Sequence, residues 1–164
     1  MNVSDNRMTE EKRKSRFYPL NGIRVCIDRE GATLAGRMYS KMTDDVMEFE
    51  STSKMLLEAD MLFDEKGYPQ RFMEVRSFRE KETTSVSYRL PEEIVPDHVI
   101  WEQQGKCCTI DIIVESRRKA GWQGTVCMPD RSHVREFKSE LEMLKIMEVM
   151  IEMQQKSASW QSIF

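Results

Sequence analysis

One eleven-residue string occurs twice in this chain and constrains its fold more than any other feature. Residues 46–56 read VMEFESTSKML and residues 134–144 read VREFKSELEML, so the pattern V-x-E-F-x-S-x-x-x-M-L returns after 88 positions. The same offset relates Gly36 to Gly124 upstream of the string. Because matching positions continue beyond the string, the sequence predicts an internal duplication of one folding unit.

The duplicated unit is expected to contain three strands followed by a helix. In the first repeat, residues 17–70, a first strand alternates apolar and polar residues, and two more strands are expected at 34–41 and 46–49, with a turn at 43–45. Ser51 is a good N-cap for the helix that follows. The predicted inward-facing residues are Ile23, Val25 and Ile27 on the first strand and Met55, Leu56, Ala59, Leu62 and Phe63 on the helix.

The second repeat, residues 107–156, predicts the same order of elements. Its three strands are expected at residues 110–115, 122–128 and 133–137, with a hairpin turn at 116–121. Ser139 and Glu142 form an S-x-x-E capping box, which predicts the start of the second helix. The fold class is therefore α+β: two tandem βββα repeats form one pseudo-twofold domain in which two helices cover an antiparallel sheet.

Three segments lie outside the repeats. Residues 1–16 are charged and predict a disordered arm, and residues 71–106 connect the repeats and predict an extra edge strand near 84–90. Residues 157–164 form an apolar tail that should pack on its own domain or dock elsewhere.

Composition argues against several classes of protein. The 25 Lys and Arg residues against 28 Asp and Glu residues give a net charge of −3, so nucleic acid is not the expected partner. The chain has no long apolar run and a polar N-terminus, which predicts a cytoplasmic protein without membrane spans. The four cysteines lack zinc-site spacing, so we expect reduced thiols, no metal and no cofactor.

Motifs that carry chemistry are absent from the sequence. There is no G-x-G-x-x-G, no phosphate-binding G-x-x-x-x-G-K-[ST], no H-E-x-x-H and no G-x-S-x-G. Neighbouring acids such as Asp44 and Asp45 fall at predicted turns, where they do not converge on a cleft. The chain is therefore expected not to be an enzyme.

A basic turn in the second repeat is the first candidate site. Arg117, Arg118 and Lys119 precede Trp122, whereas the corresponding turn of the first repeat carries mixed charge. Three cations beside an aromatic ring could bind phosphate and stack a base. The alternative is a solvated turn followed by a core tryptophan.

A glutamate kept in both repeats is the second candidate. Glu48 and Glu136 occupy the same position on the third predicted strand. Each carboxylate could accept a hydrogen bond at the junction of strand and helix. Alternatively, the two could converge across the pseudo-twofold axis as a ligand site or an enzymatic cleft.

The second helix predicts self-association. It carries the methionine stripe Met143, Met147, Met150 and Met153 together with a second apolar line at Ile146 and Val149. A helix with apolar residues on two sides needs a packing partner on each of these sides. We therefore expect a homodimer formed through this helix and the apolar tail.

Residues 110–150 also carry a resemblance to known sequences. They contain A-G-W-Q-G at 120–124 and F-K-S-E-L-E-M-L-K at 137–145. In these motifs the chain resembles small uncharacterised bacterial proteins with a W-Q-G strand followed by an F-[RK]-S-x-L-E-[LM]-[LI]-K helix start, a group without an assigned activity. Residues 13–27 are similar to the leader of PilZ domains, but the second PilZ element, [DN]-x-S-x-x-G, is absent.

These observations favour a non-enzymatic cytoplasmic binding or regulatory module that acts through protein–protein contacts. A binder of nucleic acid or of a phosphate-bearing ligand, using the turn at 117–119, is the alternative. An enzyme with a cleft between the repeats is the third hypothesis.

Overall fold

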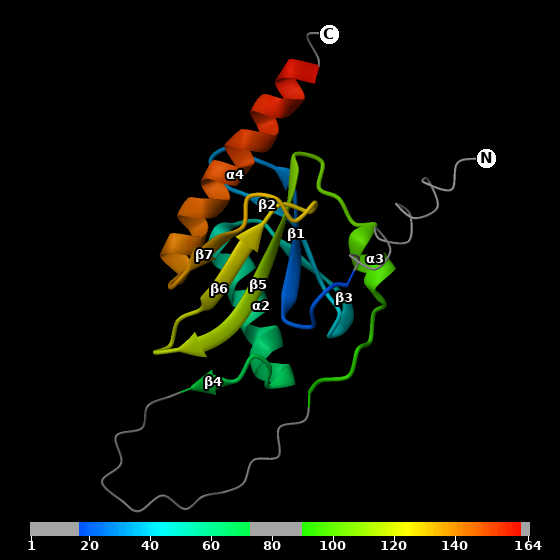
Figure 1. Ribbon diagram of the computed structural model, residues 1–164, viewed down its shortest axis with the longest axis vertical. Helices are drawn as coiled ribbons and strands as arrows, with labels where there is room; N and C mark the ends of the chain where they lie inside the picture. The colour runs from blue at the N-terminus through cyan, green and yellow to red at the C-terminus, as the bar shows by residue number, and fades with distance from the viewer. Residues whose placement is uncertain (1–16, 73–89, 162–164) are drawn as a thin grey trace, which may run out of the picture.

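The computed structural model describes residues 17–72 and 90–161. The elements in chain order are β1 (Gly22–Arg29), β2 (Ala35–Ser40), β3 (Thr43–Phe49), α2 (Thr52–Lys66), β4 (Arg71–Phe72), α3 (Asp97–Trp101), β5 (Cys108–Arg118), β6 (Gln123–Cys127), β7 (Arg135–Phe137) and α4 (Glu140–Gln161) (Figure 1). The predicted arm at 1–16, residues 84–89 of the expected edge strand and residues 162–164 of the apolar tail lie outside the described residues.

One antiparallel sheet organises the fold, in the strand order β3-β2-β1-β5-β6-β7. The first strands of the two predicted repeats, β1 and β5, pair with each other at its centre, and the third strands, β3 and β7, form its two ends. The short β4 pairs in parallel with the end of β5. The predicted α+β class is confirmed.

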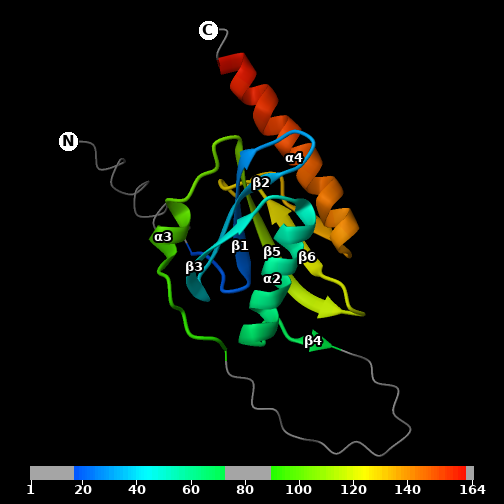
Figure 2. The same cartoon turned by 180° about the vertical axis from the view of Figure 1, so that it is seen from behind.

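Both long helices pack against one hydrophobic core. Alternate residues of the central strands enter this core, and the sheet presents their neighbours to its other face. The two views in Figures 1 and 2 show α2 and α4 beside the sheet, with the C-terminal part of α4 extending beyond it. The buried helical residues are Met55, Ala59, Leu62 and Phe63 on α2 and Met143, Met147, Met150 and Ile151 on α4.

The predicted caps begin both helices. The Ser51 hydroxyl accepts a hydrogen bond from the Lys54 backbone N–H at 3.1 Å, and the Ser139 hydroxyl accepts one from the Glu142 N–H at 3.2 Å. The Glu142 carboxylate accepts from the Lys138 N–H at 3.3 Å, one residue before the partner that a capping box predicts. The capping serines therefore fix where each helix starts.

Two predicted turns are wrong. Residues 43–45 belong to β3, which begins at Thr43, so the β2–β3 connection is only two residues long. In the second repeat β5 continues to Arg118, and the hairpin turns at Lys119 and Ala120, whose φ values are 52° and 58°. Two successive positive φ values are typical of the tight turn whose twist matches the flanking strands. The polar residues that suggested longer turns lie on strand ends instead.

Candidate functional site

The basic turn is not assembled as the sequence suggested, because Arg117 is buried. Its side chain is only 2% exposed, and its guanidinium donates to the Pro69 carbonyl at 2.7 Å. It also donates to the carboxylates of Asp64 at 2.7 Å and Asp60 at 3.2 Å. Arg117 therefore joins β5 to the C-terminal half of α2 and is not available to a ligand.

Trp122 is part of the same structural cluster. Its indole N–H donates to Asp60 at 3.1 Å, and its ring meets the Phe63 ring edge-on with centroids 5.5 Å apart. Burial alone would raise the pKa of the Asp60 carboxyl, but the Trp122 hydrogen bond and the Arg71 and Arg117 charges outweigh burial and lower that pKa. Trp122 thus packs in the core and does not offer a stacking surface.

Only Arg118 and Lys119 of the three predicted cations face solvent. They lie at the tip of the β5–β6 hairpin. There the Gln123 side chain accepts a hydrogen bond from the Arg118 backbone N–H and donates one to the Arg118 carbonyl. Two solvated cations provide weak, salt-screened attraction for phosphate. The phosphate-binding alternative stays a prediction, and it would rest on Arg118 and Lys119 without Arg117.

The two repeated glutamates are far apart. Glu48 lies on β3 and Glu136 on β7, the first and last strands in the sheet order, and both side chains are exposed. Four strands separate them, at about 4.8 Å for each step across the sheet. They cannot form one symmetric ligand site or catalytic pair.

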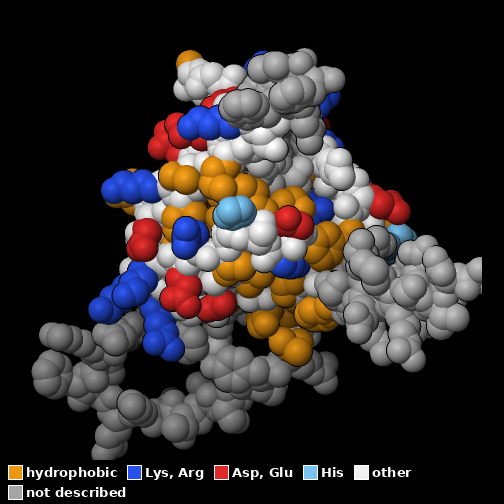
Figure 3. Space-filling view, turned by 45° about the horizontal axis from the view of Figure 1, so that its top comes forward, with side chains coloured by type: hydrophobic (Ala, Val, Ile, Leu, Met, Phe, Trp, Pro, Cys, Tyr) orange, Lys and Arg blue, Asp and Glu red, His pale blue; other side chains and the backbone are white. Residues whose placement is uncertain are grey.

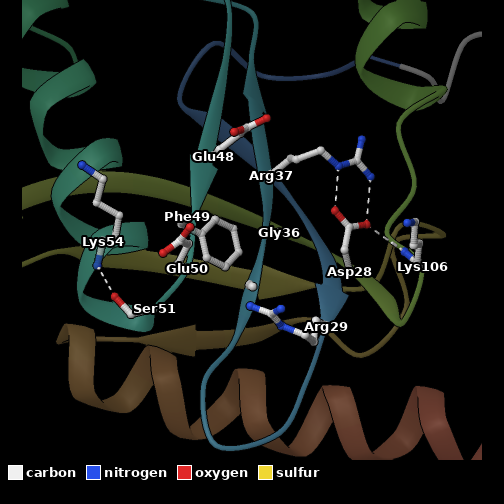
Figure 4. A pocket seen from close by; sticks show the side chains of 11 residues that line it. Asp28, Arg29, Gly36, Arg37, Glu48, Phe49, Glu50, Ser51, Lys54 and Lys106 are labelled. Atoms are coloured by element: carbon white, nitrogen blue, oxygen red, sulfur yellow. Dashed lines mark hydrogen bonds and ion pairs between the residues drawn. The ribbon is translucent and has the colours of Figure 1, made fainter.

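A wide hollow beside Glu48 has mixed charge (Figure 4). It lies over β2 and β3 at the N-terminus of α2. Within it, Arg37 binds Asp28 through two hydrogen bonds of 2.8 and 3.0 Å, and this pairing lowers the pKa of the Asp28 carboxyl. The Lys106 backbone N–H also donates to Asp28. Asp28, Arg37 and the Lys106 backbone therefore satisfy one another, and the Ser51 hydroxyl in the same hollow caps α2.

A buried ion pair on the face of the sheet that points away from the helix-covered core escaped the sequence prediction. Arg24 and Asp111 face each other across β1 and β5, at 1% and 0% exposure, with bonds of 2.9 and 2.7 Å. The Tyr18 hydroxyl donates to the same carboxylate at 2.9 Å, and Trp101 of α3 lies against the Arg24 guanidinium. The pair fastens Tyr18 and α3 to the sheet.

The thiols are poorly suited to nucleophilic chemistry. Burial raises the pKa of the Cys26 thiol to about 11 and that of Cys108 to about 12, and it also raises the pKa of Cys127. A thiol reacts as its thiolate, so burial disfavours the reactive form of these three. The described residues contain no group of three or more His, Cys, Asp and Glu side chains placed to hold a metal ion.

An apolar groove between α4 and the β7 end of the sheet is the remaining candidate. It encloses about 260 Å³ and is lined by Ile146, Val149, Met150 and Met153 of α4, with charged or polar side chains at the rim. Val149 is 57% exposed and Met153 37% exposed. Figure 3 shows apolar side chains gathered at the centre of one face of the molecule, with charged side chains around them. The rim residues of the groove are His133, Arg135, Glu142 and Lys145.

Comparison with known proteins adds no family. The chain matches no protein-family model, no curated protein and no solved structure. Within the described residues, none of the helices combines the length and apolar character that crossing a bilayer requires.

Proposed function

We propose that this chain is a non-enzymatic protein-interaction module whose docking surface is the outer face of α4, and that its partner on this surface is a second copy of the chain. The observation that carries the proposal is the uncovered apolar line of Val149 and Met153, continuous with the half-buried Ile146. Apolar side chains arranged along one exposed helix face are typical of a surface that another protein covers.

The remaining chemistry of the described chain agrees with a binding role. The buried charges that could be catalytic are engaged with one another: Arg117 with Asp60 and Asp64, and Arg24 with Asp111. Each of these contacts ties one element to another. We therefore propose that the polar groups of the interior stabilise the fold and that recognition occurs on the surface of α4.

We also propose that the molecule arose by duplication of a βββα unit. In support, β2 and β3 pair Gly36 with Phe49, and β6 and β7 pair Gly124 with Phe137, which are the same positions of the two repeats. Val149 and its α2 equivalent, Met61, are both exposed, whereas Met153 corresponds to Glu65, so we propose that the copies have diverged at this end of the apolar line. A cytoplasmic location stays a prediction from the lack of a long apolar run and the polar N-terminus.

The substitution Val149→Glu tests the docking surface. It places a charge at the centre of the exposed line without touching the core, so we expect the sedimentation mass to fall from dimer to monomer while the melting temperature changes little. Leu57→Glu is the matched control, because Leu57 is a similarly exposed apolar residue on α2. A Val149→Glu chain that keeps the mass of the parent would reject α4 as the docking surface.

A further inference from the structure

The charged residues along α4 are ordered so that acidic residues of one helix would meet basic residues of a second, antiparallel copy. Glu142, Ile146, Val149, Met153 and Lys156 follow one another at alternating spacings of four and three residues. This is the spacing of a single seam along a helix that packs against another helix. The acidic Glu142 lies at one end of the seam and the basic Lys156 at the other, and three apolar residues lie between them.

We infer that two copies of the chain pack their α4 helices antiparallel about a twofold axis through Val149. This inference rests on the proposed docking surface and names the arrangement in which the partner covers it. Reversing the seam about Val149 places Glu142 opposite Lys156 of the copy, seven residues or about 10 Å from the axis on either side. The same reversal sets Ile146 beside Met153 of the copy, so apolar residues meet apolar residues.

The residues beside the seam also carry opposite charges that would meet in an antiparallel pair. Lys145 and Glu152 are both exposed and lie on one side of it. Antiparallel packing brings Lys145 of one copy beside Glu152 of the other, and twofold symmetry repeats the contact. Each interface would therefore contain four attractive pairs of opposite charge, two at the ends of the seam and two on its flank.

A parallel arrangement of the same helices would have the opposite electrostatics. In register, it would place the seam residues Glu142 and Lys156 each against the same residue of the copy, while Lys145 and Glu152 would find no partner of opposite charge on the same side of the interface. Like charges at close range disfavour such an interface, whereas alternating signs set partner choice and orientation in paired helices. The charge order therefore selects antiparallel self-recognition, and the apolar centre supplies the contact area.

A cysteine on the axis tests this geometry directly. Val149→Cys, made with Cys107→Ser because Cys107 is the exposed native thiol, should form an intermolecular disulfide on mild oxidation. A residue on a twofold axis meets its own copy, within the Cα separation of about 4–7 Å that a disulfide needs. Leu57→Cys in the same background is the control, and we expect it to give only slow, concentration-driven crosslinking.

A charge exchange on the flank gives a second test. Lys145→Glu and Glu152→Lys should each weaken dimerisation about tenfold, because each turns two attractive pairs into repulsive ones. The double variant restores opposite charges across the axis and should recover the parental dissociation constant to within about twofold. Additive weakening in the double variant would overturn the antiparallel arrangement.

The outcomes separate this inference from the proposed function. Rapid crosslinking of the Val149→Cys variant together with recovery in the double charge variant supports the antiparallel arrangement. A parent chain that dimerises, and that Val149→Glu dissociates, but whose Val149→Cys variant crosslinks no faster than the Leu57→Cys control, overturns the arrangement and leaves α4 as the docking surface. A parent chain that stays monomeric overturns both.

Discussion

At the scale of single residues, the Arg24–Asp111 pair is the most sensitive to substitution. Both side chains are buried at the centre of the sheet, where an unpaired charge is costly. Asp111 accepts from Arg24 and Tyr18, while a second guanidinium nitrogen of Arg24 donates to the Trp101 carbonyl at 3.2 Å. One cluster of contacts thus holds the N-terminal segment, both central strands and α3 together.

Asp111→Ala should lower the free energy of unfolding by about 3–5 kcal/mol, because it leaves the Arg24 guanidinium buried without its carboxylate. Replacing both partners with apolar residues, Arg24→Met with Asp111→Leu, should recover most of that loss. Tyr18→Phe removes one hydrogen bond and should cost about 1 kcal/mol. Urea unfolding of the variants measures these costs, and a loss below about 1 kcal/mol for Asp111→Ala would contradict the role of the pair.

At the scale of elements, the two strand-to-helix units each pair a buried phenylalanine with a glycine on the neighbouring strand. Phe49 and Phe137 are each 2% exposed and pair with Gly36 and Gly124, respectively. A Cβ at Gly36 would lie 2.0 Å from the Cys26 carbonyl oxygen, and one at Gly124 would lie 1.9 Å from that of Ile113. Glycine is needed at both positions because the neighbouring strand passes too close for a side chain.

Phe49→Ala and Phe137→Ala should therefore destabilise the protein to a similar degree, by about 3–5 kcal/mol each, since both leave a cavity in the shared core. Val46→Ala is the control, because Val46 is 48% exposed on the same strand as Phe49. Urea unfolding monitored by circular dichroism gives the comparison. If only one phenylalanine mattered, the two units would not contribute equally to the core.

The sequence predicted which strands and helices form more accurately than it predicted where the strands end. Alternation of apolar residues located β1 and β5, and Ser51 and Ser139 located both helix starts, because these signals are local. The ends of β3 and β5 were missed because their residues are polar yet extended, and polar residues alone do not distinguish an exposed strand end from a turn.

The surroundings of the predicted site residues could not be predicted for a different reason. Arg117 was predicted as part of a basic cluster, and only the fold shows that Asp60 and Asp64 of α2 neutralise it. Likewise, nothing in the local sequence pairs Arg24 with Asp111, 87 positions away. The apolar surface of α4 was predicted, because an excess of apolar residues on one helix is visible without knowledge of distant contacts.

At the scale of the whole molecule, the core accounts for only one side of α4. The buried stripe that includes Met143 and Met147 packs on the sheet, while Val149 faces outward and the end of the helix extends beyond the sheet (Figure 2). The central claim is that a second copy covers this outward side. The remaining polar clusters serve the fold of each copy.

Sedimentation equilibrium of the full chain shows whether a second copy covers α4. We expect a mass of twice 19.4 kDa at micromolar concentration, with reversible dissociation on dilution, because the interface is centred on a few apolar residues. A mass of 19.4 kDa that stays constant up to about 100 µM would mean that no second copy binds there.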